Sequence, residues 1–214
     1  MSIRKKILIL LPTGMTVRNF LHTNVIQLLL ENDKIDIICC VDNPQKYNSL
    51  FSDKRISFIN FVKTKSYSFS NILLTIVRRR TELVYENQTT KILRDGNFNK
   101  RFPINADYFS AYPFPRSKIL LKIFSLLLEN LYLSKKEIRR VISECSPDLV
   151  VATHVVSRFE YDYLREAKKN GIKVIGMVKS FDNLTSKGII PMKLDFLIAW
   201  NEIIKKELMD MYNY

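Results

Sequence analysis

The chain is short of the residues that make turns. Only five of its 214 residues are Gly and seven are Pro. Because sandwiches and barrels join many short strands through Gly- and Pro-rich turns, this scarcity argues against an all-β fold. Hydrophobic residues make up 47% and charged residues 26%, a globular balance that excludes a disordered or collagen-like chain. The length favours one large domain.

Cysteine is rare as well. The three cysteines are Cys39, Cys40 and Cys145, and none has metal-ligand or CxxC spacing. We therefore expect no metal site built on thiolates, and a chain that works in a reducing cytoplasm.

Long apolar runs are also missing. The longest, residues 119–133, is interrupted by Lys122, Glu129 and Asn130, and is too short and too polar to span a bilayer. The first residues, MSIRKKILILLPTG, imitate a signal peptide, but their apolar core covers only residues 7–11 and no small-residue cleavage site follows. That segment is predicted to be a first strand.

Positive charge, in contrast, is abundant. The chain holds 34 Lys and Arg against 21 Asp and Glu, which leaves a net charge of +13. Residues 54–122 hold 14 basic and four acidic residues, and so carry ten of those charges. An anionic partner is expected there: nucleic acid, phospholipid headgroups or a phosphorylated small molecule. Helix-turn-helix, RNP and zinc-finger patterns are absent, so we expect no nucleic acid.

Short apolar runs alternate with longer helical patterns along the chain. Such alternation predicts βαβ units and an α/β fold, a Rossmann-like doubly wound and mostly parallel sheet of about six strands. Several of the runs are apolar throughout, as strands covered on both faces are. The predicted strands are 7–11, 36–41, 56–61, 149–152, 173–178 and 196–200.

Helices are predicted between and after these strands, over residues 16–30, 44–50, 69–100, 117–133, 134–144, 159–170 and 202–212. Thr13 or Thr16 is expected to cap the first, and Gly171 to end the one at 159–170. Residues 102–117 form an aromatic, Pro-rich connection without helical period. We expect residues 1–200 to form the Rossmann-like domain and residues 201–214 to begin a helix or linker.

Polar residues follow three of the predicted strands. After the first, LPTGMTVRNF contains Gly14, expected to let the backbone turn tightly, and Arg18, Asn19 and His22, which share one helix face. The helix N-terminus there suits a phosphate or a sugar hydroxyl. Neither GxGxxG nor a P-loop pattern is present, so an ordinary βα turn remains an alternative.

His154 follows the fourth strand, where it suits a general base or an anion contact, although a hydrogen-bonded loop histidine fits the same pattern. The loop after the fifth strand, MVKSFDNLTSKG, is the most polar of the three. It presents Lys179, Ser180, Asp182 and Asn183. Polar residues that only brace their own loop are the alternative here.

The segment SFDNLTSKG, followed by DFLIAWNE and the helix IIKKELMDMY, resembles the N-terminal half of bacterial GT-B glycosyltransferases of surface-polysaccharide and lipopolysaccharide biosynthesis. In that family the loop usually reads SWDNLTSKG, so Phe181 replaces a Trp. The resemblance covers most of the chain, but its specific motifs lie within residues 179–207.

The resemblance implies an acceptor-binding domain that works with a second, nucleotide-binding domain. The nucleotide-sugar donor would bind that second half, which this sequence lacks, so no cofactor is expected in this one. No DxD element flanked by apolar strands is present, so no metal is expected either. The implied acceptor is a glycan or a lipid-linked sugar at the cytoplasmic face of the inner membrane. Alone, the chain is not expected to transfer sugar.

A basic patch of Arg78, Arg79 and Arg80 is expected to hold anionic headgroups at that membrane, in a peripheral and salt-sensitive way. The aromatic candidates for the membrane interface beside this patch are Tyr108, Phe109, Tyr112 and Phe114. The alternative is equally open: residues 119–133 form a core helix, and the three arginines lie on a solvated face.

If the first, fourth and fifth strands are neighbours, the residues at their ends converge on one site. His154 is then the first candidate for the base, Asp182 the second and His22 the third. Arg18 and Lys179 are the expected anion contacts, with Gly14, Asn19, Ser180 and Asn183 as further substrate-binding residues. Two other functions stay open: half of a glycerophosphotransferase-like transferase or sugar-nucleotide epimerase, and a non-catalytic basic binding protein.

Overall fold

The structure, a computed structural model, describes residues 4–63, 72–74, 76–77, 84, 117–131, 135–180, 184, 190 and 192–212. The chain divides into two compact units. The first comprises Met1–Thr64, Ser134–Lys179 and Leu194–Ile198, and the second Lys65–Leu133, Ser180–Lys193 and Ala199–Tyr214. The expected division into residues 1–200 and 201–214 stays a prediction.

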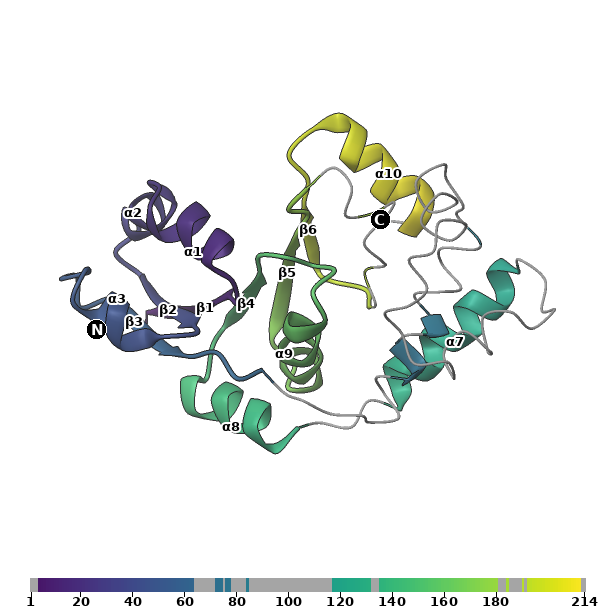
Figure 1. Ribbon diagram of the computed structural model, residues 1–214, viewed down its shortest axis with the longest axis horizontal. Coiled ribbons are helices and arrows are strands. Elements are labelled where there is room, and N and C mark those ends of the chain that lie inside the picture. The colour runs from purple at the N-terminus through teal and green to yellow at the C-terminus, as the bar shows by residue number, and fades with distance from the viewer. Residues whose placement is uncertain are drawn as a thin grey trace, which may run out of the picture. The chain divides into compact units, whose positions relative to one another are not determined.

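The first unit is built on a six-stranded sheet in which every strand pair is parallel. The strand order is β3-β2-β1-β4-β5-β6, the doubly wound order of a Rossmann-like fold (Figure 1). The α/β fold expected from the sequence is thereby confirmed. The strands are β1 (Lys5–Leu11), β2 (Ile35–Val41), β3 (Ile56–Asn60), β4 (Leu149–Ala152), β5 (Lys173–Met177) and β6 (Phe196–Ile198).

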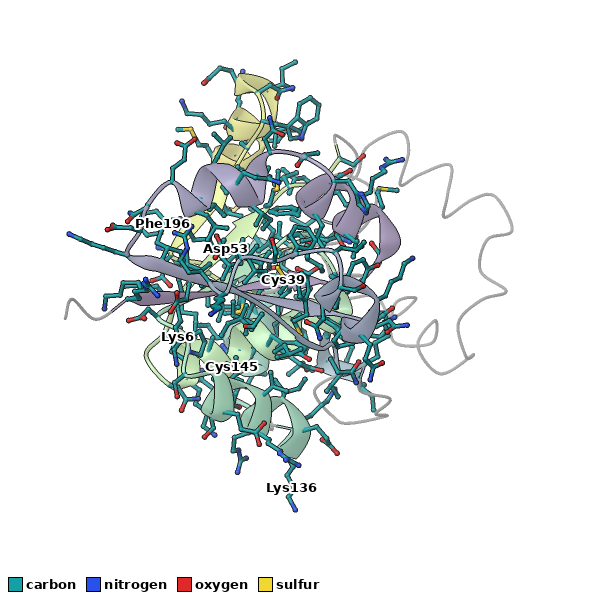
Figure 2. All side chains as sticks on the ribbon, turned by 90° about the vertical axis from the view of Figure 1, so that its left-hand side faces the viewer. Lys6, Cys39, Asp53, Lys136, Cys145 and Phe196 are labelled. Atoms are coloured by element: carbon teal, nitrogen blue, oxygen red, sulfur yellow. The ribbon has the colours of Figure 1, made fainter. Side chains whose placement is uncertain are left out.

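Helices cover both faces of this sheet. Helices α1 (Gly14–Leu21) and α2 (Val25–Leu30) pack with Ile7, Ile9 and Leu11 of β1 on one face. Helices α8 (Lys136–Cys145) and α9 (Arg158–Lys169) lie on the opposite face, as both views show (Figures 1 and 2). Because successive side chains of a strand point to opposite faces, both sets of β1 side chains are buried. This double cover explains why β1 and β2 are apolar almost throughout.

The helix expected over residues 16–30 is wrong in one respect, because the chain forms two helices there. Helix α1 ends at Leu21 and α2 begins at Val25. In an unbroken helix the Thr23 amide would donate to the Asn19 carbonyl, but the Thr23 hydroxyl takes that acceptor at 2.7 Å. The Thr23 side chain thus competes for the Asn19 carbonyl at the point where α1 ends.

The other elements of the first unit lie close to their predicted positions. The short helix α3 spans Pro44–Asn48, and β6 ends at Ile198, two residues before its predicted end. Helix α9 ends as expected, because Gly171 adopts the left-handed φ of 71° that follows a helix C-cap. Its amide and that of Ile172 donate to the Lys168 and Ala167 carbonyls, both at 3.0 Å.

In the second unit, the described residues form α7 (Lys118–Asn130) and α10 (Glu202–Tyr212). The Ser117 hydroxyl caps α7 and the Asn201 side-chain carbonyl caps α10. Within the described ranges, no helix is long and apolar enough to cross a membrane. Most of the helical stretch predicted at 69–100, and residues 102–116 of the Pro-rich connection, lie outside the described residues.

Candidate functional site

The direction of the chain across the sheet reverses between β1 and β4. These strands are neighbours, yet the chain leaves β1 toward β2 over the α1 face and leaves β4 toward β5 over the α9 face. Ligands of open α/β sheets bind beyond the carboxyl ends of the strands at such a reversal. The prediction from the sequence required the first, fourth and fifth strands to be neighbours, and β1, β4 and β5 do lie side by side.

The loop after β1 is only two residues long and passes directly into α1. Thr13 is the N-cap: its hydroxyl accepts from the Thr16 amide at 3.3 Å, while the Thr16 hydroxyl accepts from the Thr13 amide at 3.1 Å. This reciprocal capping box holds the first turn in one conformation. The amides of Gly14 and Met15 donate to none of the residues that the structure describes, as is usual at a helix start.

Gly14 does not make the tight turn expected of it. Among the described glycines only Gly171 has a positive φ, and Thr13 provides the extended residue before the helix. A Cβ at Gly14 would meet no atom within 4 Å. Arg18, Asn19 and His22 are all exposed, and Arg18 forms no ion pair with the described part of the chain.

The loop after β4, residues 153–157, is tied to both neighbouring strands. The buried Thr153 hydroxyl donates to the Leu10 carbonyl of β1 at 2.7 Å, and the Val155 amide donates to the Met177 carbonyl of β5 at 3.2 Å. Gly176 makes room for Leu194 and for this loop, because a Cβ there would lie 2.4 Å from the Leu194 Cδ1 and 3.2 Å from the Val155 Cβ. The loop is thus fixed on either side of His154.

The backbone of His154 is held at both of its polar groups. Its amide donates to Oε2 of Glu160 at 3.1 Å, and its carbonyl accepts from the Ser157 amide at 2.7 Å. The residue is half-buried. A candidate base needs such a defined position, since proton transfer depends on geometry before it depends on pKa.

Glu160 was not among the residues singled out from the sequence. Its side chain is completely buried in the first turn of α9, and Oε1 accepts no hydrogen bond from the residues that the structure describes. Burial raises the pKa of this carboxyl well above its usual range, against the lowering effects of the His154 amide, the Lys179 charge and the Thr153 amide. A buried carboxyl that favours its neutral form therefore lies under the loop that carries His154.

One signal in the sequence pointed to Glu160. Ser157 and Glu160 have the S-x-x-E spacing of a capping box, in which the Glu side chain returns to the N-cap amide. The Ser157 side chain makes no such bond here, and the Glu160 carboxyl accepts instead from the amide of His154, three residues before the N-cap. The motif predicts a helix start but not this partner.

Lys179 comes two residues after β5 and is half-buried. The topology thus brings Gly14, Arg18, Asn19, His154 and Lys179 to one edge of the sheet. Ser180 is half-buried and belongs to the second unit. Asp182 and Asn183, and also Arg78, Arg79 and Arg80, lie outside the described residues.

The described residues contain no group of three His, Cys, Asp or Glu that could hold a metal ion. The thiols of Cys39 and Cys40 are buried in the core. Burial raises the pKa of Cys39 to about 12 and raises the pKa of Cys40 as well. Figure 2 places Cys39 in the interior of the first unit. Neither thiol is therefore a nucleophile near neutral pH.

Comparison of the chain with models of known protein families, with curated proteins and with solved structures finds no match.

Proposed function

We propose that the chain is the acceptor-binding half of a glycosyltransferase that works in cell-surface polysaccharide synthesis. One observation carries the proposal: polar loops flank the reversal between β1 and β4, where open α/β sheets bind their ligands. The resemblance of SFDNLTSKG to the acceptor domain of GT-B enzymes selects this function among those that the fold accommodates.

In this proposal, two cations bind the anionic part of the acceptor. Arg18 lies in α1, after β1, and Lys179 follows β5, so a phosphate at the reversal has a positive side chain on either side. Gly14 leaves the start of α1 uncovered for a close approach, and Asn19 offers an amide from the same helix.

His154 is the proposed general base, which takes the proton of the acceptor hydroxyl. Its support is the fixed backbone between Glu160 and Ser157. Asp182 is the second choice, and Ser180 and Asn183 are proposed to bind acceptor hydroxyls from the same loop.

The donor, a nucleotide-sugar, is proposed to bind a second domain that faces this one, and we propose no metal for the transfer. The acceptor is a glycan or a lipid-linked sugar, reached by peripheral attachment at the cytoplasmic face of the inner membrane. Arg78, Arg79 and Arg80 are proposed to contribute to that attachment through their charge.

Calorimetric titration of the purified chain tests the proposal. The probes are a soluble short-chain polyprenyl pyrophosphoryl monosaccharide as acceptor and a nucleoside diphosphate sugar as donor. We expect the acceptor to bind and the donor to bind at least about tenfold more weakly. Arg18→Ala and Lys179→Ala should each lower acceptor affinity by roughly tenfold, because each removes a charge-assisted contact.

The matched control is Lys34→Ala, an exposed cation beside the start of β2, at the opposite edge of the sheet. It should keep the affinity of the chain. His154→Ala should also bind normally, since a base acts on the proton and not on the phosphate. Tighter binding of the donor than of the acceptor, or equal losses in the control, would contradict the proposal.

A further inference from the structure

Helix α7 carries apolar side chains on two opposite sides. Leu128 is fully buried, whereas Ile119 is 74%, Ile123 46%, Leu126 48% and Leu127 41% exposed. At about 100° of rotation per residue, these four exposed side chains fall within a sector of roughly 100°, on the side opposite Leu128. We call this set the α7 stripe.

The α7 stripe is more than scattered surface hydrophobicity. Its members are large aliphatic side chains spaced one or two turns apart, and Leu131, directly after the helix, is also 45% exposed. Single exposed leucines are normal, but a contiguous apolar patch marks a surface that another body covers.

The charge around the α7 stripe indicates which kind of partner covers it. Lys118 and Lys122 are exposed on one flank of the stripe in the first two turns, and the one acidic residue of the helix sequence, Glu129, comes near its end. The helix also begins within residues 54–122, which carry a surplus of ten positive charges. A second copy of the chain would bring like charges together, whereas an anionic bilayer offers an apolar interior beneath negative phosphates.

The length of α7 decides how it meets a bilayer. Thirteen residues rise about 20 Å, less than the hydrocarbon core of roughly 30 Å. A helix of this kind, apolar on one side and flanked by lysines, lies in the plane of the interface instead of crossing it.

We propose that α7 binds the surface of an anionic membrane, with the α7 stripe among the upper acyl chains and Lys118 and Lys122 at the phosphates. The site adds α7 to Arg78, Arg79 and Arg80, the membrane patch expected from the sequence, which left open whether residues 119–133 form a core helix. The inference deepens the proposed function and rests on it, since a lipid-linked acceptor is met at such a surface.

Co-sedimentation of the full chain with vesicles tests the site. The vesicles are a phosphatidylglycerol and phosphatidylethanolamine mixture, with pure phosphatidylcholine for comparison. We expect binding to the anionic vesicles only. The double variant Ile119→Ser and Ile123→Ser should weaken it at least about tenfold, because two aliphatic side chains no longer leave water. Lys122→Glu should weaken it several-fold, since a charge near the surface is reversed.

The matched control is Leu28→Ser with Leu50→Ser, two leucines that are 60% and 61% exposed in the first unit. This variant should bind vesicles like the unaltered chain. Circular dichroism verifies folding, and Lys122→Glu keeps the test decisive if the double variant does not fold. Equal binding by unaltered chain and α7 variants, or no binding at all, overturns the inference.

Analytical ultracentrifugation without lipid decides between a membrane and a second copy. We expect the same sedimentation for the unaltered chain and the double variant. A dimer that the double variant dissociates would assign the stripe to self-association and overturn the membrane inference. Titration of the soluble acceptor needs no vesicles, so the inference and the proposed function can fail separately. An unaltered chain that binds the acceptor but no vesicles refutes this inference alone, and an unaltered chain that binds vesicles but not the acceptor refutes the proposed function alone.

Discussion

A buried carboxyl without a full set of partners is costly, and Glu160 is such a group. Its Oε2 accepts a hydrogen bond from the His154 amide, whereas its Oε1 accepts none from the residues that the structure describes. The positive end of α9 and the charge of Lys179 favour the ionised form, but burial outweighs them and raises the pKa. The neutral acid is therefore the form that the fold prefers.

This preference predicts that stability falls with rising pH. Between the ordinary glutamate pKa, about 4.3, and the raised pKa of folded Glu160, the native state holds a proton that the unfolded chain has lost. Each pH unit in that window removes at most about 1.4 kcal/mol of unfolding free energy. In Glu160→Gln this contribution is absent, so the variant should lose less stability than the unaltered chain between pH 5 and 8 in urea unfolding.

The stability of Glu160→Gln at a single pH does not test this prediction, because the buried glutamine amide has N–H donors without acceptors and lowers stability at every pH. The test is the slope of the unfolding free energy against pH. Glu137→Gln, in the exposed first turn of α8, is the matched control and should follow the unaltered chain. Identical slopes for the chain and Glu160→Gln would refute an unusually basic Glu160.

Among the elements, α9 combines a polar sequence with deep burial. Its acidic side chains Asp162 and Glu166 are 6% and 2% exposed. Lys135 forms an ion pair with Asp162 at 2.5 Å, and the side-chain Nδ2 of Asn170 donates to Oε1 of Glu166 at 3.0 Å. Because these polar groups are paired, the helix can lie against the sheet without leaving buried charge uncompensated.

Tyr163 joins α9 to the far strands of the sheet. Its ring stacks on Phe61 with the centroids 5.0 Å apart, and its oxygen accepts from the Val62 amide at 2.8 Å and from the Cys40 thiol. The side chain is fully buried, so the Val62 amide has no ready substitute for this acceptor.

Tyr163→Phe should therefore lower the unfolding free energy by about 1–3 kcal/mol, the cost of an unmet buried donor. Chemical denaturation monitored by circular dichroism measures it. Tyr47→Phe is the control, because Tyr47 stacks on Phe58 in the same way but its hydroxyl makes no hydrogen bond with the described residues. A Tyr163→Phe loss no larger than that of Tyr47→Phe would show that the oxygen of Tyr163 contributes nothing.

At the scale of the whole sheet, two pairs of neighbouring strands, β1 with β4 and β5 with β6, are each joined at their amino ends by an aspartate side chain. Asp148, just before β4, accepts from the Lys6 amide of β1 at 2.9 Å and pairs with Lys5 at 2.8 Å. Asp195, just before β6, accepts from the Val174 amide of β5 at 2.9 Å. Each carboxylate thus adds one hydrogen bond to the backbone ladder between its two strands, and each also pairs with a lysine, Lys5 or Lys173.

Both carboxyls have a lowered pKa. Hydrogen bonds from the Lys5 side chain and the Lys6 amide lower that of Asp148. Burial alone would raise that of Asp195, but the Val174 amide and Lys173 more than offset it. A lowered pKa contributes stability above the ordinary aspartate value of about 3.9, and that contribution is lost as pH falls through the folded value.

The double variant Asp148→Asn and Asp195→Asn should therefore flatten the acid limb of the stability profile. Below about pH 4 the unaltered chain should lose stability more steeply than the variant, as thermal melts across pH 2–6 will measure. Asp33→Asn, an exposed carboxyl at the turn before β2, should keep the steep limb. Parallel acid limbs for the chain and the double variant would contradict the argument.

The sequence by itself determined the strands and most helices, because these depend on neighbours in the chain. Short apolar runs such as 149–152, which alternate with helical patterns, favour strands of a covered sheet. Thr13 and Gly171 mark a helix start and a helix end through local backbone chemistry. The adjacency of β1, β4 and β5 was posed as a condition, since periodicity shows what a strand is but not which strand lies beside it.

Only the tertiary structure decided features that depend on partners distant in the chain. Thr153 is held by the Leu10 carbonyl, 143 residues away, and Glu160 is buried by packing that its capping-box spacing does not reveal. From the sequence a core helix stayed one of two interpretations for residues 119–133, and only the structure shows that one side of α7 is exposed. Hydrophobicity determines that a side chain tends to leave water, but which surface receives it depends on the packing of whole elements, and local sequence does not encode that packing.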